Sequence, residues 1–91
     1  MDNAKFIAKA AKALGDRHRL NILREIAKQG SITITEAIAL STLAQPSISH
    51  HVKLLTDSEL VEANKNGRTV HLSINKEKMQ EFTNWFGEKA N

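Results

Sequence analysis

The stretch "PSISHHVKLL", residues 46–55, contains the single proline of the chain, followed by apolar side chains at helical spacing. On a wheel of about 100° per residue, Ile48, Val52 and Leu55 fall on one stripe, which predicts a buried helical face. Proline suits the first turn of a helix, because its missing N–H has no helical partner there. The stretch therefore predicts a helix over residues 46–58 with one buried side and one free side.

The two adjacent histidines of this helix point in different directions. On the same wheel His50 lies almost opposite the buried stripe, and His51 lies on the flank of the stripe, about 100° away. Two ligands to one metal from a single helix need a spacing of three or four residues, which these two lack. We expect His50 to be exposed and functional. We expect His51 to pack against the domain, with its nitrogens reaching a backbone or phosphate group.

The outward positions of this helix suit the major groove of DNA. Small hydroxyls approach base edges or phosphates, glutamine can pair with adenine, and a helix N-terminus favours phosphate. Residues 37–56 contain no aspartate or glutamate, although a gap of this length among ten acids also arises by chance. We expect the DNA-facing side chains here to be Gln45, Ser47, Ser49, His50 and Lys53.

The segments before this helix predict three more helices. Apolar spacing indicates helices over residues 3–14 and 16–28, separated by Gly15 as a stop and Asp16 as an N-cap. The β-branched run at 31–35 is either a brief extended segment or the lead into a third helix, 36–42, for which we expect Thr35 as the N-cap. The third and fourth helices, joined by a turn of about four residues, form a helix-turn-helix.

The segments after it predict a hairpin and a last helix. Residues 60–64 form a strand, Asn66-Gly67 predicts a type I′ turn, and residues 69–75 alternate, with Val70, Leu72 and Ile74 on one face. A final helix over 76–89 follows. The predicted order of elements is ααααββα, which is mainly α with a β-hairpin. This order predicts a winged helix-turn-helix fold, with residues 1–91 forming a single domain. The wing tip, expected on phosphate or in the minor groove, carries Lys65, Asn66 and Arg68.

Composition limits the remaining possibilities. The chain has 91 residues, a net charge of +3 and no cysteine, so neither a disulfide nor a thiolate metal site can stabilise its small core. The sequence holds no run of about 18 apolar residues, and lysines interrupt the N-terminal segment, so we expect a soluble cytoplasmic protein. A nucleophile elbow, a phosphate loop and a paired acid/base cluster are also missing, which argues against an enzyme.

Three segments together resemble the ArsR/SmtB-type winged-helix transcriptional repressors: "ALGDRHRLNILREI", "QPSISHHVKLL" and "ELVEANKNGRTVHLSIN". They are similar to the family's D-P-T-R stretch, its S-x-H-L-x-x-L recognition helix and its G-L-V…G-R…Y-x-L wing, over about residues 10–75. The resemblance implies that Gln45, Ser49 and His50 face double-stranded DNA. For a homodimeric repressor, we expect the DNA site to be an inverted repeat. It places His51 at the family's recurring histidine and Lys65, Asn66 and Arg68 at the wing tip.

The resemblance also implies a dimer that pairs through the first and last helices. Every aromatic residue of the chain lies in these two predicted helices. The aromatic side chains could instead cap the core of a monomer, but a chain this short gains more from burial in a dimer. We expect the interface to contain Phe6, Ala10, Met79, Phe82, Trp85 and Phe86.

The departures from the family pattern concern its effectors. The third predicted helix lacks the cysteine motif of the arsenic and cadmium sensors, and the last has neither histidine nor aspartate, only Glu77, Glu81 and Glu88 as possible ligands. We therefore predict no metal and no cofactor, and leave the effector and the operator open. Two alternatives remain. One is a metal-responsive repressor using His18, His51 or His71 with Asp16 or Asp57. The other is a protein-interaction module, for which Leu54 is the single apolar residue on the groove side.

Overall fold

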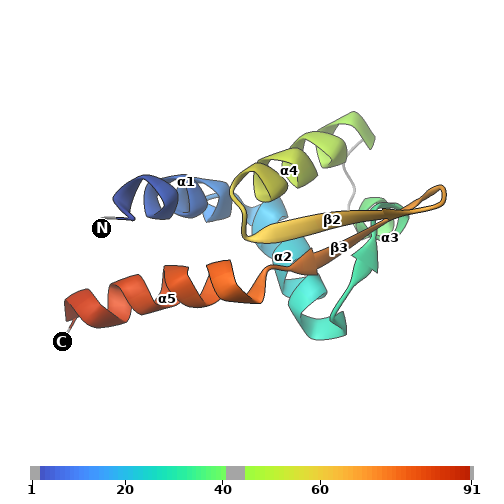
Figure 1. Cartoon of the computed structure of the whole chain (residues 1–91). Coiled ribbons are helices and arrows are strands. Elements are labelled where there is room, and N and C mark those ends of the chain that lie inside the picture. Colours follow the sequence, from blue (N-terminus) through green and yellow to red (C-terminus); the bar gives the residue numbers. More distant parts are fainter. Residues whose placement is uncertain (1–2, 41–44, 91) are drawn as a thin grey trace.

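Helices make up most of the fold, and a long hairpin projects from it (Figure 1). The computed structural model describes residues 3–40 and 45–90. The observed order is the expected one, with one short strand added between the second and third helices. The elements are α1 (Ala4–Leu14), α2 (Arg17–Gln29), β1 (Ile32–Thr33), α3 (Ile34–Ala39), α4 (Gln45–Asp57), β2 (Val61–Asn66), β3 (Thr69–Ile74) and α5 (Lys76–Ala90).

The core lies where α2, α3 and α4 meet one face of the sheet. The apolar stripe predicted for α4 is confirmed, because Ile48 and Leu55 are fully buried and Val52 is 6% exposed. They pack in one cluster with Ile26 of α2 and Leu72 of β3. Burial of these side chains fixes which side of α4 faces inward and therefore which side remains exposed.

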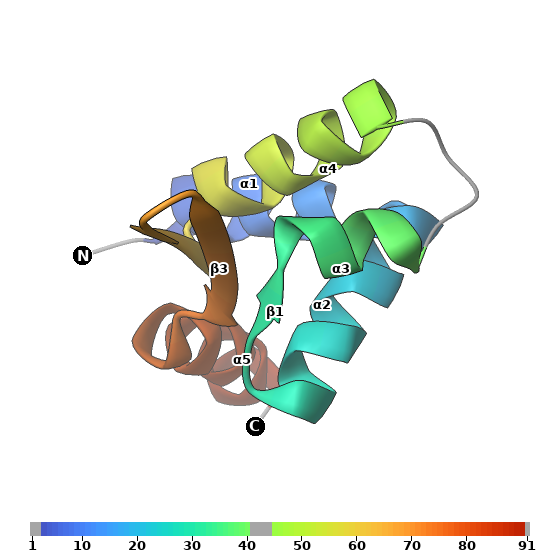
Figure 2. The same ribbon diagram turned by 90° about the vertical axis from the view of Figure 1, so that its right-hand side faces the viewer.

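The three strands form an antiparallel sheet in the order β1-β3-β2. Strand β3 is central and pairs with β1 at Ile32 opposite Leu72 and with β2 along its whole length. The predicted alternation along β3 is confirmed: Leu72 is buried, and Val70 and Ile74 pack against the same core cluster. Figure 2 shows β1 beside β3, with α4 above the strands and α5 below and behind them.

Two details of the turns differ from the sequence predictions. Helix α3 begins after Thr33, not Thr35, because Thr33 and Glu36 form a reciprocal capping box that satisfies two backbone N–H groups. In the hairpin, Asn66 pairs with Thr69, so the central residues are Gly67 and Arg68. Only Gly67 has a positive φ, 65°, which is the type II′ pattern and not the predicted type I′.

Helix α4 ends at a tight junction with β2. The buried Ser58 hydroxyl donates to the Leu55 carbonyl and accepts from the Leu60 N–H, so it stays paired inside the core. Glu59 follows with φ 70°, in the left-handed region that glycine adopts at lower cost. This sharp turn carries the chain directly from α4 into the wing.

Helices α1 and α5 lie side by side and extend together away from the body, with both ends of the chain at their tips (Figure 1). This extension makes the molecule elongated, 42 Å by 24 Å by 21 Å. Within the part of the chain that the structure describes, no helix is long and apolar enough to cross a membrane.

Candidate nucleic-acid interface

The outward face of α4 carries small and basic side chains. Ser47, Ser49, His50 and Lys53 are all exposed, opposite the buried stripe, as the helical wheel predicts. The Lys53 ammonium lies 3.0 Å from the Asp57 carboxylate one turn later, so a phosphate would compete with this exposed ion pair. Gln45 begins the helix, but its side chain lies outside the described residues. We call the exposed set Ser47, Ser49, His50 and Lys53 the α4 face.

The wing supplies a second exposed polar surface. From Glu62 to Thr69 every residue of the hairpin is exposed, including Lys65, Asn66 and Arg68 at its tip. The tip projects beyond the rest of the molecule (Figure 1). A two-stranded arm with two cations at its end is suited to reach a phosphate backbone beside the groove that a helix occupies.

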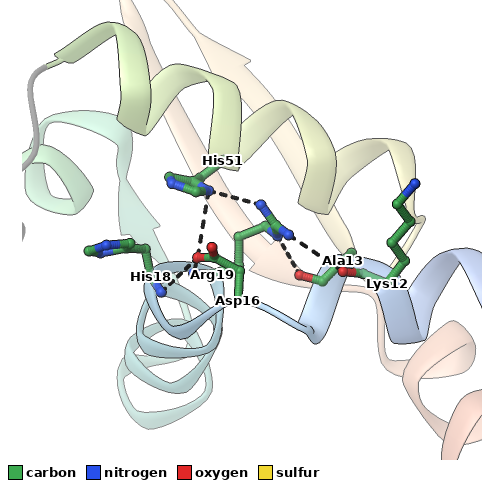
Figure 3. Close-up of polar contacts among 6 residues, drawn as sticks. All are labelled: Lys12, Ala13, Asp16, His18, Arg19 and His51. Atoms are coloured by element: carbon green, nitrogen blue, oxygen red, sulfur yellow. Dashed lines mark hydrogen bonds and ion pairs between the residues drawn. The ribbon is translucent and has the colours of Figure 1, made fainter.

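His51 lies on the flank of α4 and is held by side chains of α2. Its ring is 13% exposed, and its Nδ1 lies 3.0 Å from Nη1 of Arg19 and 3.8 Å from Oδ1 of Asp16 (Figure 3). The expectation that His51 packs against the domain is confirmed. Its described partners are these two side chains and not a backbone group. The two histidines thus differ in environment: His50 is exposed to solvent, and His51 is enclosed beside Arg19 and Asp16.

Arg19 and Asp16 connect this histidine to the junction between α1 and α2. Arg19 donates to the carbonyl of Ala13 and, at 3.4 Å, to that of Lys12, at the end of α1. Asp16 accepts from the backbone N–H groups of His18 at 2.8 Å and Arg19 at 3.2 Å, so it is the N-cap of α2, as predicted. Three helices therefore meet at Arg19.

The surroundings of Asp16 and His51 lower the pKa of both side chains. Burial lowers the pKa of His51; the Asp16 carboxylate opposes this shift, and the Arg19 guanidinium acts in the same direction as burial. Burial would raise the pKa of Asp16, but the backbone N–H groups of Arg19 and His18 and the nearby positive charges together lower it. At neutral pH the junction therefore combines a neutral His51 with an ionised Asp16 and Arg19.

The terminal helices carry aromatic side chains that are partly exposed, while Leu20 of α2 and Leu40 after α3 are exposed elsewhere. Phe86 is 46% exposed, and Phe6, Met79, Phe82 and Trp85 are half-buried. Phe86 stacks edge-on against Phe82 and Trp85, with ring centroids 5.1 Å and 5.3 Å apart. Ala10 is fully buried within its own chain, so it has no surface to offer a second copy and drops out of the expected interface.

Three observations concern the residues that the two alternative functions would use. Among residues 3–40 and 45–90, no three His, Asp or Glu side chains are arranged to hold a metal ion. Asp16 and His51 are instead engaged with Arg19. Leu54, the apolar residue assigned to the groove side of α4, is half-buried and lines a pocket with Lys9 and Ala13 of α1. The α4 face is therefore polar.

Comparison with known proteins identifies the class. The model of the winged helix-turn-helix DNA-binding family matches residues 15–62, more than half of the chain. The transcriptional repressor SdpR of Bacillus subtilis is 31% identical over 74 residues, covering 81% of each chain. An arsenical resistance operon repressor of Staphylococcus xylosus is 34% identical over 73 residues, 80% of this chain and 69% of its own.

Solved structures agree with these relatives. The crystal structure of an ArsR family transcriptional regulator has a TM-score of 0.87 and 26% identity, covering 98% of this chain and 91% of that one. A homodimeric winged helix-turn-helix domain from Mycobacterium bovis, solved by NMR, has a TM-score of 0.76 at 23% identity, covering 96% and 81%, and supports the fold. The chain is a winged helix-turn-helix DNA-binding protein. Within that class it belongs to the ArsR/SmtB family of transcriptional repressors.

Arg19 is the residue that the sequence reasoning did not single out. Its position three residues after Asp16 matches the arginine of the family's D-P-T-R stretch, and this spacing was the available signal. Its contact with His51 joins residues 32 positions apart, which periodicity within one helix cannot reveal.

Proposed function

We propose that this protein is a repressor that binds an inverted-repeat operator as a homodimer, with α4 in the major groove. The polar α4 face is the observation that carries the proposal. Its helix is fixed from behind by Ile48, Val52 and Leu55, so a defined set of side chains meets the base edges. Because the proposed partner is chromosomal DNA, the proposed location is the cytoplasm. The proposal assigns the protein no catalytic step.

The residues have separate proposed roles. Ser49 and His50 approach base edges, and Gln45 and Ser47 lie at the helix N-terminus, where backbone N–H groups favour phosphate. Lys53 leaves its ion pair with Asp57 to bind phosphate. In the wing, Lys65, Asn66 and Arg68 bind phosphate or enter the adjacent minor groove.

The exposed aromatic surface supports the dimer. On α1 and α5, Phe86 is 46% exposed and Phe6, Met79, Phe82 and Trp85 are half-buried. A chain of this length buries a modest apolar core by itself, so pairing these surfaces adds stability. A twofold dimer presents two α4 helices about one helical turn of DNA apart, ~10 base pairs from centre to centre.

Alanine variants of the α4 face test the proposal on a site selected from random DNA. Ser49→Ala and His50→Ala should each weaken specific binding by ~1–3 kcal/mol while binding to unrelated DNA changes less. Ser31→Ala, an exposed serine in the connection after α2, is the matched control and should bind as wild type does. Wild-type affinity in both α4 variants would show that another surface reads the site.

A further inference from the structure

A polar junction joins three helices at the flank of α4, beside the α4 face. It consists of Arg19, Asp16, His51 and the carbonyls of Lys12 and Ala13, and we call it the Arg19 junction (Figure 3). Arg19 reaches back to the end of α1 and across to α4, while its own backbone N–H is capped by Asp16. One side chain thus ties the recognition helix to the helix proposed for dimerisation.

The chemistry of Arg19 fixes the state of His51 in this arrangement. A guanidinium has five N–H donors and no acceptor, and it stays charged at every relevant pH. The contact of 3.0 Å between Nη1 and Nδ1 can therefore be a hydrogen bond only if Nδ1 of His51 carries no proton. His51 must be neutral, with its proton on Nε2, for the junction to close.

Protonation of His51 reverses this contact. An N–H at Nδ1 cannot accept from Arg19, and the imidazolium and guanidinium repel one another at this distance. The new donor faces the Asp16 carboxylate, 3.8 Å away, which offers the protonated ring a different partner. The other titratable groups that face the ring are His18 of α2 and His50 of α4, with ring centroids 5.5 Å and 6.2 Å away.

We propose that Arg19 is a positioning residue for DNA binding, which holds α4 at its reading angle through neutral His51 and releases it when His51 is protonated. This inference rests on the proposed role of the α4 face. His51 is the immediate neighbour of His50, so a small rotation of α4 about its buried stripe moves His50 and Ser49 relative to the bases. Contacts that read a ligand lose strength when their supporting shell is loosened by about 1 Å.

The lowered pKa of His51 agrees with this geometry. Burial and the positive charge of Arg19 both favour the neutral ring, so the junction is closed at neutral pH and opens on acidification. Selective binding should therefore weaken in mildly acidic solution. Unselective binding should not weaken, because added positive charge on the protein strengthens attraction to phosphates.

The test compares affinity for the selected site with affinity for unrelated DNA from pH 7.5 to pH 5.5 at constant ionic strength. For wild type, the affinity for the selected site divided by the affinity for unrelated DNA should fall about tenfold on acidification, which corresponds to about 1.4 kcal/mol. His51→Asn keeps an acceptor, Oδ1, at the same number of bonds from Cα as Nδ1, but it does not titrate. This variant should match wild type at pH 7.5 and hold its ratio at pH 5.5.

Two further variants separate positioning from structural support. Arg19→Lys keeps the charge but one ammonium cannot bridge α1 and His51, so this variant should show the reduced ratio already at pH 7.5. His71→Asn, the same substitution in β3, should keep the wild-type pH profile. Melting curves at both pH values confirm that each variant is folded under the assay conditions.

The outcomes distinguish the two proposals. A wild type that shows no preference for any selected site at pH 7.5 overturns the proposed function. A wild type that prefers its site but shares its pH profile with His51→Asn overturns the role of the junction alone. Long-range proton–nitrogen NMR gives a variant-independent reading: His51 should be the Nε2–H tautomer at pH 7.5, and a proton on Nδ1 at that pH would also overturn the role.

Discussion

The exposed cations of α4 and the wing predict how strongly the affinity for DNA depends on salt concentration. Each protomer offers three exposed cations to DNA, Lys53 on α4 and Lys65 and Arg68 at the wing tip. A dimer then neutralises about six phosphates, and the logarithm of its affinity falls against the logarithm of salt concentration with a slope of about −5. Lys53 must leave Asp57 to bind phosphate, so it contributes only partly to the slope. The four wing cations of a dimer alone give a slope of about −4, so the expected slope lies between about −4 and −5.

Lys65→Gln removes one wing cation from each protomer. The slope should become shallower by about 1.8, so the variant binds more weakly than wild type at low salt and approaches wild type as salt rises. Fluorescence anisotropy with the selected site at several salt concentrations between 50 and 200 mM measures both slopes. Affinity for unrelated DNA should show the same change, because phosphate contacts carry no sequence information.

Lys28→Gln is the matched control for this experiment. Lys28 is also an exposed lysine and lies in the last turn of α2, which is below the sheet in Figure 1, whereas α4 is above it. Its substitution changes the net charge by the same amount without removing a wing contact, so its slope should equal that of wild type. If Lys65→Gln and Lys28→Gln share one slope, the wing does not touch the DNA backbone.

Three further predictions concern folding and assembly. Glu59→Gly should raise the free energy of unfolding by about 0.5–1 kcal/mol in denaturant titrations, because glycine adopts φ 70° without the strain of a side chain; an unchanged or lower value would contradict this reading of the α4–β2 turn. Phe86→Glu should shift the protein from dimer toward monomer in sedimentation equilibrium, since it places a charge in the proposed apolar interface, and an unaltered dimer would move the interface elsewhere. Folded His51 has a lowered pKa, so its contribution to stability is complete above the ordinary histidine pKa and is lost as pH falls through the folded value. Thermal unfolding should therefore show a loss of stability below about pH 6.5 that His51→Asn reduces, and equal losses in both proteins would refute it.

The sequence predicted the parts of the fold that local periodicity controls. The stripe of Ile48, Val52 and Leu55, the alternation along β3 and the cap at Asp16 each depend on residues close together in the chain, and all three were confirmed. The start of α3 was wrong because Thr33 and Thr35 both suit an N-cap. The choice between them depends on Glu36, which lies three residues after Thr33 and completes the capping box there.

The contacts that the sequence could not predict join distant segments. The contact between Arg19 and His51 depends on how α2 crosses α4, and tertiary packing sets that crossing. The burial of Ala10 likewise depends on packing, since a small apolar residue on an amphipathic helix suits a dimer interface and a monomer core equally well. The turn type of the hairpin depends on the strand register. Because Asn66 pairs with Thr69, Gly67 is the first of the two central turn residues, whereas the Asn-Gly pair predicted it as the second.

The measurement that tests the central claim most directly is selection of bound sequences from a random DNA pool by the intact wild-type protein. A homodimer that reads with α4 should enrich an inverted repeat whose half-sites lie about one helical turn, ~10 base pairs, apart. The same selection with His50→Ala should relax the preference at specific positions within each half-site and leave their spacing unchanged. A pool with no enriched sequence, or with an enriched sequence that lacks twofold symmetry, would contradict the account.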